Sequence, residues 1–175
     1  GHAGEQGKVD GPACREALVC TQSRIYNLLN SQGNTPVDSF HRDLGAIMIN
    51  HCGISRHAKG LKQGLQAVAA LSERFQHEVR VPGEAHGPNA ELEKALRVSD
   101  FFGLADLMLR DALAREESCG AHFREEHQSA EGEALRDDAN FAHIAAWEHN
   151  ANGTPIRHTE ALQFNTLKPS TRSYK

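Results

Sequence analysis

The sequence predicts a mainly α-helical fold, an antiparallel bundle of three or four helices with a small β-hairpin at its C-terminal end. Three observations predict it. Apolar residues recur at intervals of three and four through most of the chain, which is the helical period. Gly or Pro ends each periodic segment. Near the C-terminus the period changes to an alternation around an Asn-Gly pair, a strong hairpin signal.

Composition limits the class of protein. The chain has 175 residues, of which 39% are hydrophobic, and this suits a single domain with a real core. The net charge is −4, with Lys and Arg scattered among Asp and Glu, so a nucleic-acid partner is not expected. No apolar run approaches the ~18 residues of a membrane helix, so membrane insertion is not expected either. The four cysteines include no CxxC pair, which favours thiols over disulfides.

The first two helices have recognisable starts. A helix is expected at residues 11–32, with Pro12 in its first turn and Gly33 after its end. The second helix is expected to begin at Thr35 as N-cap, with Pro36 as the first helical residue. A helical apolar stripe follows directly, so both segments are expected to contribute to the core.

Two longer helices follow. The third is expected at residues 55–79, and Pro82 prevents its extension. Asn89 is the expected N-cap of the longest helix, which runs to about Ser118 with Gly120 as its stop. This last helix is apolar on more than one side, which is typical of a helix at the centre of a bundle.

The C-terminal third has a different texture. Residues 141–149 alternate, Asn152-Gly153 supplies the turn, and residues 155–164 supply a return strand. An isolated hairpin is marginally stable in water, so it is expected to pack on the helices.

Chemistry-bearing residues form no recognisable active site. Cys119 and His122 are three apart but lie around a helix stop, which favours a thiol at a helix end over a nucleophile with its base. His143, His149 and His158 could meet across the hairpin, but no HExxH or zinc-finger spacing accompanies them. No GxGxxG follows a strand, and no P-loop is present. We therefore expect no catalytic residue, no cofactor-binding residue and no metal ligand in this chain.

The stretch AREESCGAHFREE, residues 114–126, is unusually dense in charged residues. Its adjacent carboxylates, Glu116 with Glu117 and Glu125 with Glu126, point in different directions and are expected to face solvent. From the residues alone the chain is a helical docking or scaffolding element.

The chain contains a series of motifs, HCGISR (51–56), LSERFQHEVRV (71–81), the long helix running into ESCGAH (91–126), RDDANF (136–141) and LKPSTRSYK (167–175). Their order resembles the C-terminal part of the flavoprotein subunit of succinate dehydrogenase and fumarate reductase, from about Thr35 to the end. L-aspartate oxidase resembles the same helical region and is the second choice.

The resemblance implies a spectrin-repeat-like helical domain of a larger flavoprotein. The parent would interconvert succinate and fumarate, passing electrons through FAD to an iron–sulfur subunit and quinone. In the family, the FAD fold and the substrate residues lie before this region, so no cofactor is expected in this chain. The expected partners are the flavin-binding domain and the iron–sulfur subunit, at the inner face of the cell membrane and peripheral to it in the cytoplasm. A free-standing helical interaction module is the alternative from a different class.

The chain is expected to divide into three parts. Residues 1–34 form an N-terminal segment and first helix, residues 35–126 the bundle core, and residues 127–175 the loop, hairpin and tail, all in one domain. The opening GHAGEQGKVDG looks like a processed end, an expression scar or an excised fragment. An excised domain is expected to expose its docking face, and a non-native dimer through that face is possible.

Three residues of the dense stretch are the docking candidates. Arg115, His122 and Arg124 are expected to donate to groups across an interface with the flavin domain. The alternative is a helix cap contained within the bundle, and both arrangements are compatible. The chain departs from the family at Cys119, where Arg is common, and at residues 142–145, where the family often has Leu-x-His-Thr.

Overall fold

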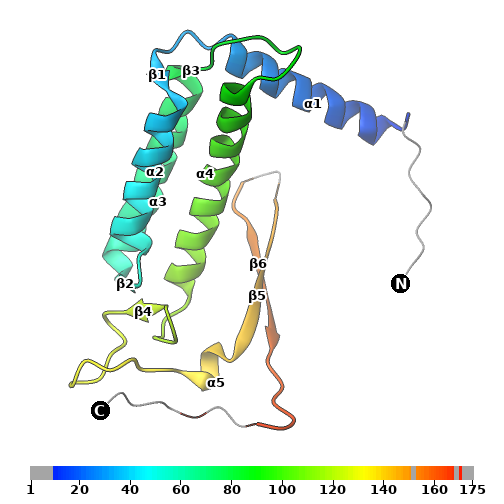
Figure 1. The fold of residues 1–175 in the computed structure, drawn as a ribbon. Helices are drawn as coiled ribbons and strands as arrows, with labels where there is room; N and C mark the ends of the chain where they lie inside the picture. The colour runs from blue at the N-terminus through cyan, green and yellow to red at the C-terminus, as the bar shows by residue number, and fades with distance from the viewer. Residues whose placement is uncertain (1–9, 151–152, 168–169, 171–175) are drawn as a thin grey trace. The chain divides into compact units, whose positions relative to one another are not determined.

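The computed structural model describes residues 10–150, 153–167 and 170 (Figure 1). The fold is mainly helical with short strands, as the sequence predicts. The elements are α1 (Pro12–Leu29), β1 (Thr35–Pro36), α2 (Val37–Cys52), β2 (Ser55–Arg56), α3 (Ala58–Glu78), β3 (Val79–Arg80), α4 (Ala90–Ala114), β4 (Phe123–Arg124), α5 (Asp138–Phe141), β5 (His143–Glu148) and β6 (Ile156–Ala161).

The chain divides into two compact units, each built from two separate stretches. The first comprises residues 1–41 and 72–100, and the second comprises residues 42–71 and 101–175. Helices α2, α3 and α4 each contribute one end to each unit. Consecutive helices therefore run in opposite directions through each unit, as in an antiparallel bundle.

The first unit has an aromatic core. Phe40 of α2 and Phe75 of α3 are buried and meet edge to face, with ring centroids 5.2 Å apart and planes at 86°. Leu28 is the buried residue of α1. Because most of α1 is exposed, this helix contributes little to the core of its unit.

A short parallel strand pair joins two helix ends in the first unit. Thr35 and Pro36 pair with Val79 and Arg80, which directly follow the last residue of α3. The expectation that Thr35 is an N-cap is wrong, because this pairing keeps its backbone extended and α2 begins at Val37. Gly33 lies against the same segment, where an added Cβ would sit 2.0 Å from the backbone of Glu78.

The start of α4 confirms a sequence prediction. Asn89 accepts a hydrogen bond from the amide of Leu92 at 3.0 Å, which is the N-cap interaction. Its side-chain amide also donates to the carbonyl of Pro82 at 3.1 Å. One residue therefore caps the helix and closes the loop before it.

A glycine lets three helices approach in the second unit. A Cβ at Gly64 of α3 would lie 2.8 Å from Leu109 of α4 and 2.9 Å from His51 of α2. Leu109 is fully buried. The other buried apolar residues of this unit are Leu44, Cys52, Leu61, Val68, Leu71, Phe102, Ala105 and Ala112.

The predicted hairpin is present and is attached to α4 (Figure 1). Strands β5 and β6 pair in register from His143 with Ala161 to Glu148 with Ile156. Trp147 donates its indole N–H to the carboxylate of Asp111 at 2.9 Å. The turn residue Asn152 lies outside the described residues.

Helix ends differ from the sequence expectation in two further places. Helix α3 runs from Ala58 to Glu78, because the residues on either side are held in strand pairs. Helix α4 ends at Ala114 instead of Ser118, so Gly120 is not its stop. Gly120 has φ +59 and lies in a later turn.

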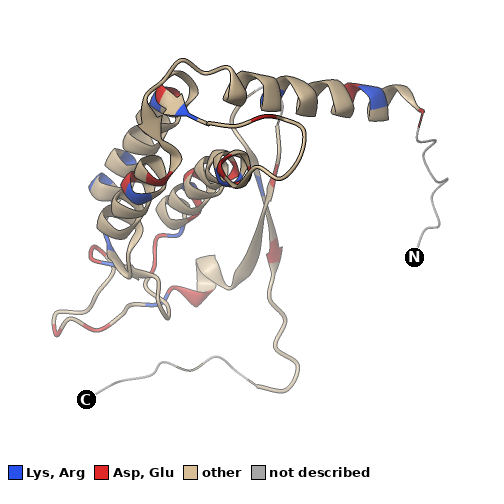
Figure 2. Ribbon diagram, turned by 45° about the horizontal axis from the view of Figure 1, so that its top comes forward, with Lys and Arg blue, Asp and Glu red and all other residues tan. Residues whose placement is uncertain are grey.

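The charges are interspersed along the helices (Figure 2). Several form surface pairs at helical spacing, such as Arg97 with Glu93 and Arg74 with Glu78. Exposed pairs of this kind contribute little to stability. Among the described residues, no helix is both long and apolar enough to cross a lipid bilayer.

Candidate functional site

Arg124 closes the C-terminal end of α4. Its side chain is only 2% exposed, and Nη1 donates to the carbonyl oxygens of Ala112 at 3.0 Å, Leu113 at 3.2 Å and Arg115 at 3.2 Å. These are carbonyls that a helix end leaves without intrahelical partners, and a cation there also complements the helix dipole. The described residues therefore contain the self-contained cap that was one of the two expectations.

Ser118 fixes the backbone of Arg124. The Ser118 hydroxyl donates to the carbonyl of Arg124 at 3.1 Å and accepts from its amide at 2.8 Å. Both residues are buried. A hydroxyl can act as donor and acceptor at once. This dual role holds residues 118–124, the return segment that follows α4, against the end of that helix.

Glu117 is the buried carboxylate of the site. It is 2% exposed, so the expectation that this acidic pair faces solvent is wrong for Glu117. One oxygen accepts from Arg115 Nε at 2.8 Å and Nη2 at 2.6 Å. The other accepts from the amide of Asp137 at 2.8 Å. A buried carboxylate is tolerated because it is paired and hydrogen-bonded in this way.

His122 bonds to the backbone and not to the neighbouring thiol. Its Nε2 lies 2.8 Å from the carbonyl oxygen of Arg115. Burial is the largest cause that lowers the pKa of His122. The hydrogen bond to the Arg115 carbonyl opposes this shift, and the positive charges of Arg56, Arg115 and Arg124 add to it. The neutral imidazole, donating from Nε2, is therefore favoured.

Cys119 and His122 meet only through their backbones. The amide of Cys119 donates to the carbonyl of His122 at 2.8 Å, and the amide of His122 returns a bond at 3.1 Å. Gly120 supplies the positive φ that this turn requires. The arrangement is a turn and not a nucleophile with its base.

Strand β4 carries the return segment to the start of α3. The amide of Phe123 donates to the carbonyl of Ile54 at 3.1 Å, and that of Glu125 donates to the carbonyl of Arg56 at 2.9 Å. Glu126 accepts from the amide of Ala58, the first residue of α3, at 2.6 Å. A carboxylate at a helix N-terminus satisfies a free amide and complements the dipole.

Sequence comparison identifies the region. Residues 41–174 match the sequence model of the family described as fumarate reductase flavoprotein C-term. The chain belongs to this family.

Curated relatives of the fumarate reductase flavoprotein C-terminal family cover most of the chain. The fumarate reductase flavoprotein subunit of Escherichia coli K12 is 29% identical over 153 residues, or 87% of this chain and 25% of that protein. L-aspartate oxidase 2 of Ralstonia nicotianae is 37% identical over 126 residues, or 68% of this chain and 21% of that protein. The chain thus spans about a quarter of the length of these relatives.

A solved structure of quinol-fumarate reductase with menaquinol molecules has the same fold. It superposes with a TM-score of 0.77 at 27% identity, covering 97% of this chain and 28% of that chain. The superposition extends to almost the whole chain, whereas the family match begins at residue 41. The closing Arg172 and Tyr174, which carried part of the resemblance, lie outside the described residues.

Membership of a flavoprotein family implies the cofactor FAD. The described residues of this chain contain no fold of the kind that binds it. Dinucleotides bind at a parallel βαβ sheet. The parallel pairs described here are two residues long, and the six-residue strands form an antiparallel hairpin. The described residues therefore do not fit the cofactor.

Two of the three histidines that could have met across the hairpin have separate partners. His143 lies 2.9 Å from Arg157, and His158 lies 2.7 Å from Glu148. Within residues 10–150, 153–167 and 170, no group of three His, Cys, Asp or Glu side chains is placed to hold a metal ion.

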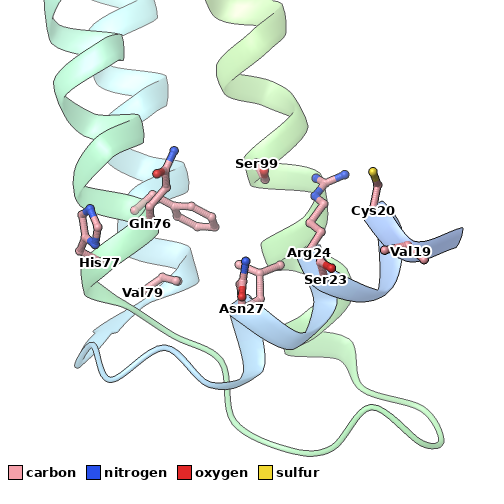
Figure 3. A pocket seen from close by; sticks show the side chains of 11 residues that line it. Val19, Cys20, Ser23, Arg24, Asn27, Gln76, His77, Val79 and Ser99 are labelled. Atoms are coloured by element: carbon pink, nitrogen blue, oxygen red, sulfur yellow. The ribbon is translucent and has the colours of Figure 1, made fainter. Parts of the chain in front are cut away.

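A cavity lies in the first unit, beside α1 (Figure 3). It encloses about 650 Å³ between α1, the end of α3 and Ser99 of α4. Arg24 is already paired with Asp100 at 2.7 Å and donates to the carbonyl of Leu96 at 2.8 Å. Cys20 and His77 stand on opposite sides of the view, so they form no thiol–imidazole pair (Figure 3).

The network around Arg124 joins all three docking candidates at one place. Sequence reasoning named Arg115, His122 and Arg124 but missed Glu117, Ser118 and Arg56. These residues stand in the HCGISR and ESCGAH motifs, but neither motif reveals their role, because burial of a polar side chain follows from contacts between distant segments. Arg56, for example, donates from Nη2 to the carbonyl of Ala121 at 3.3 Å.

Proposed function

We propose that this chain is the helical C-terminal domain of a flavoprotein that interconverts succinate and fumarate. Its role is structural: it docks on the flavin-binding domain of the parent and performs no chemical step. The observation that carries the proposal is the superposition on quinol-fumarate reductase at 27% identity over 97% of this chain. FAD is assigned to the remainder of the parent, with electrons passing to an iron–sulfur subunit and quinone.

Complex membership forms part of the proposal. The fumarate reductase relatives are flavoprotein subunits. An iron–sulfur subunit is the proposed partner, and the assembly is proposed to lie peripherally on the inner face of the cell membrane. The separation of residues 1–34 from the bundle core at 35–126 and the tail at 127–175 stays a prediction.

Arg115, His122 and Arg124 remain the proposed docking residues, with different roles. Arg115 is 36% exposed, so it is the one placed to reach a partner group. Arg124 and His122 both bond to the carbonyl of Arg115 and position this residue. The docking contact and the helix cap are therefore properties of one network.

Two alternatives rest on specific observations. L-aspartate oxidase 2 has 37% identity over 126 residues, a higher fraction than the fumarate reductase relative given above. A free-standing helical interaction module is supported by the cap, which completes the end of α4 without a partner. The experiment must separate three outcomes.

An antibody raised to the chain provides the test. The protein that it captures from source cells is assayed for bound flavin, succinate oxidation, fumarate reduction and L-aspartate oxidation. We expect a flavin-containing band much larger than 19.2 kDa with succinate and fumarate activity. L-aspartate oxidation would assign the second candidate, and a band near 19.2 kDa without flavin would assign the free-standing module.

A further inference from the structure

A second cavity lies beside the helix cap, within the second unit. It encloses about 390 Å³ between the end of α2, the last turns of α4 and strand β5. Arg56, Arg115 and His122 line one part of it, and Met108 and Trp147 line another. We call it the Arg56 pocket. Asp111 also lines it, so it combines charged and apolar walls, as sites for amphipathic groups do.

Arg56 carries a charge without a carboxylate partner. In the part of the chain that the structure describes, no Asp or Glu oxygen lies within ion-pair distance of it, and its buried Nε has no hydrogen-bond partner. Its terminal nitrogens reach the sulfur of Cys52 at 3.8 Å and the carbonyl of Ala121 at 3.3 Å. Buried guanidinium N–H groups are normally hydrogen-bonded, and the bonds that they make to a carboxylate are the strong ones.

The other charges of the pocket are engaged within the chain. Arg115 pairs with the buried Glu117. Asp111 accepts from Trp147 at 2.9 Å and lies 4.0 Å from Arg157. The positive charge of Arg56 is therefore the one left uncompensated at this wall.

An apolar stripe on α4 leads to the pocket. Phe101, Leu104 and Met108 are 39%, 55% and 49% exposed. Their spacings of three and four place them on one face of the helix. Met108 belongs to both the stripe and the pocket wall, so the two surfaces are continuous.

We propose that the Arg56 pocket receives the carboxylate of an acidic side chain on a polypeptide segment whose apolar residues cover the α4 stripe. The inference deepens the proposed docking role and rests on it for the origin of the segment, which belongs to the remainder of the parent. Charge complementarity selects the carboxylate. The stripe selects a polypeptide over a small anion, because a small anion in the pocket would leave the stripe uncovered.

The positions of the stripe residues restrict the segment. From Met108, Leu104 lies about 6 Å along the helix axis and Phe101 about 10 Å. The segment must therefore carry apolar side chains within roughly those distances of its carboxylate. A helix with an Asp or Glu one or two turns from a pair of large apolar residues fits this description.

Selection of random dodecapeptides displayed on phage, with the immobilised 175-residue chain as target, tests the proposal. We expect enriched peptides to place Asp or Glu beside large apolar residues. Binding of one synthetic enriched peptide should weaken at least about tenfold when its Glu or Asp becomes Gln or Asn. It should weaken similarly with Arg56→Gln and with Leu104→Ser in the chain.

Two controls keep the test decisive. Arg80→Gln removes an exposed arginine of β3 and should leave peptide affinity unchanged. If Arg56→Gln fails to fold by circular dichroism, the amide variant of the peptide still tests the carboxylate on the wild-type chain.

Several outcomes would overturn the inference. They are selection of no peptide, enrichment of peptides without an acidic residue, or equal affinity of the acid and amide peptides. Sedimentation showing a dimer that Leu104→Ser dissociates would assign the stripe to a second copy. None of these measurements uses flavin, so a failure here is distinct from failure of the antibody test.

Discussion

Ser118 and Arg124 bond to each other twice, through one hydroxyl. The Ser118 Oγ accepts from the Arg124 amide at 2.8 Å and donates to its carbonyl at 3.1 Å. This pair holds the segment after α4 in the place from which the Arg124 guanidinium reaches back to the helix end. The stability of the whole cap therefore depends on one small side chain.

Ser118→Ala should destabilise the chain by about 2–3 kcal/mol. The change removes two hydrogen bonds and leaves a buried amide and carbonyl unsatisfied. Urea unfolding followed by circular dichroism measures the loss. Ser23→Ala is the matched control, because Ser23 is exposed and its variant should stay within about 0.5 kcal/mol of wild type. Equal stability of the two variants would contradict the role assigned to Ser118.

Arg124→Ala should cost about 3 kcal/mol or more in the isolated chain. It removes the donor to three α4 carbonyls and opens a cavity where a fully buried side chain stood. Arg97→Ala removes an exposed pair with Glu93 and should cost less than about 0.5 kcal/mol. Chemical denaturation of both variants gives the comparison. A small loss for Arg124→Ala in the chain alone would favour docking over capping as its main role.

The helices and the hairpin could be predicted because their signals are local. Apolar spacing identified four helices, Asn89 marked the start of α4, and alternation marked β5 and β6. Helix ends were less accurate where distant segments decide them. Thr35 is extended because it pairs with Val79. Helix α4 ends at Ala114, where the Arg124 side chain donates hydrogen bonds to the last carbonyls of the helix.

The site was predictable only as a list of residue types. The density of charge in residues 114–126 indicated a special segment, and the three docking candidates Arg115, His122 and Arg124 do meet there. Glu117 was expected in solvent, because adjacent glutamates carry no sign of burial. Arg56 was missed because the residue with which it forms a hydrogen bond, Ala121, lies 65 residues away in the sequence.

His122 should make stability depend on pH below neutrality. Because its pKa is lowered on folding by burial and by Arg56, Arg115 and Arg124, the unfolded chain binds the proton first as pH falls. Stability should therefore be lost as pH drops below about 6.5, the ordinary histidine value, until the folded-state pKa is passed.

The comparison with His122→Gln isolates this contribution. Gln can still donate to the Arg115 carbonyl but does not titrate. Between pH 5 and 8, unfolding free energies of wild type should fall more steeply with decreasing pH than those of the variant. Parallel curves would show that His122 does not titrate differently in the folded and unfolded chain.

Cys52 should resist alkylation while Cys20 reacts. Burial raises the pKa of the Cys52 thiol, partly opposed by the charge of Arg56, and its sulfur lies 3.9 Å from the backbone carbonyl oxygen of Met108 in α4. Cys20 is exposed on α1. Mass spectrometry after brief iodoacetamide treatment at pH 8 should show Cys52 modified at least about tenfold more slowly, until urea unfolds the chain. Similar rates in the native chain would mean that the end of α2 is open.

Gly64→Ala should destabilise the chain, and Gly45→Ala should stabilise it. A methyl group at position 64 would meet His51 Cβ at 2.9 Å and Leu109 at 2.8 Å, and the backbone-linked His51 Cβ cannot move aside without shifting α2. Overpacking of this kind outweighs the helical advantage of Ala, leaving a net loss of about 1–2 kcal/mol. Position 45 has nothing within 4 Å, so the same substitution should gain about 0.5–1 kcal/mol. Urea midpoints of the two variants should move in opposite directions. A stabilised Gly64→Ala chain would mean that α2, α3 and α4 are not packed as closely as the three-helix contact requires.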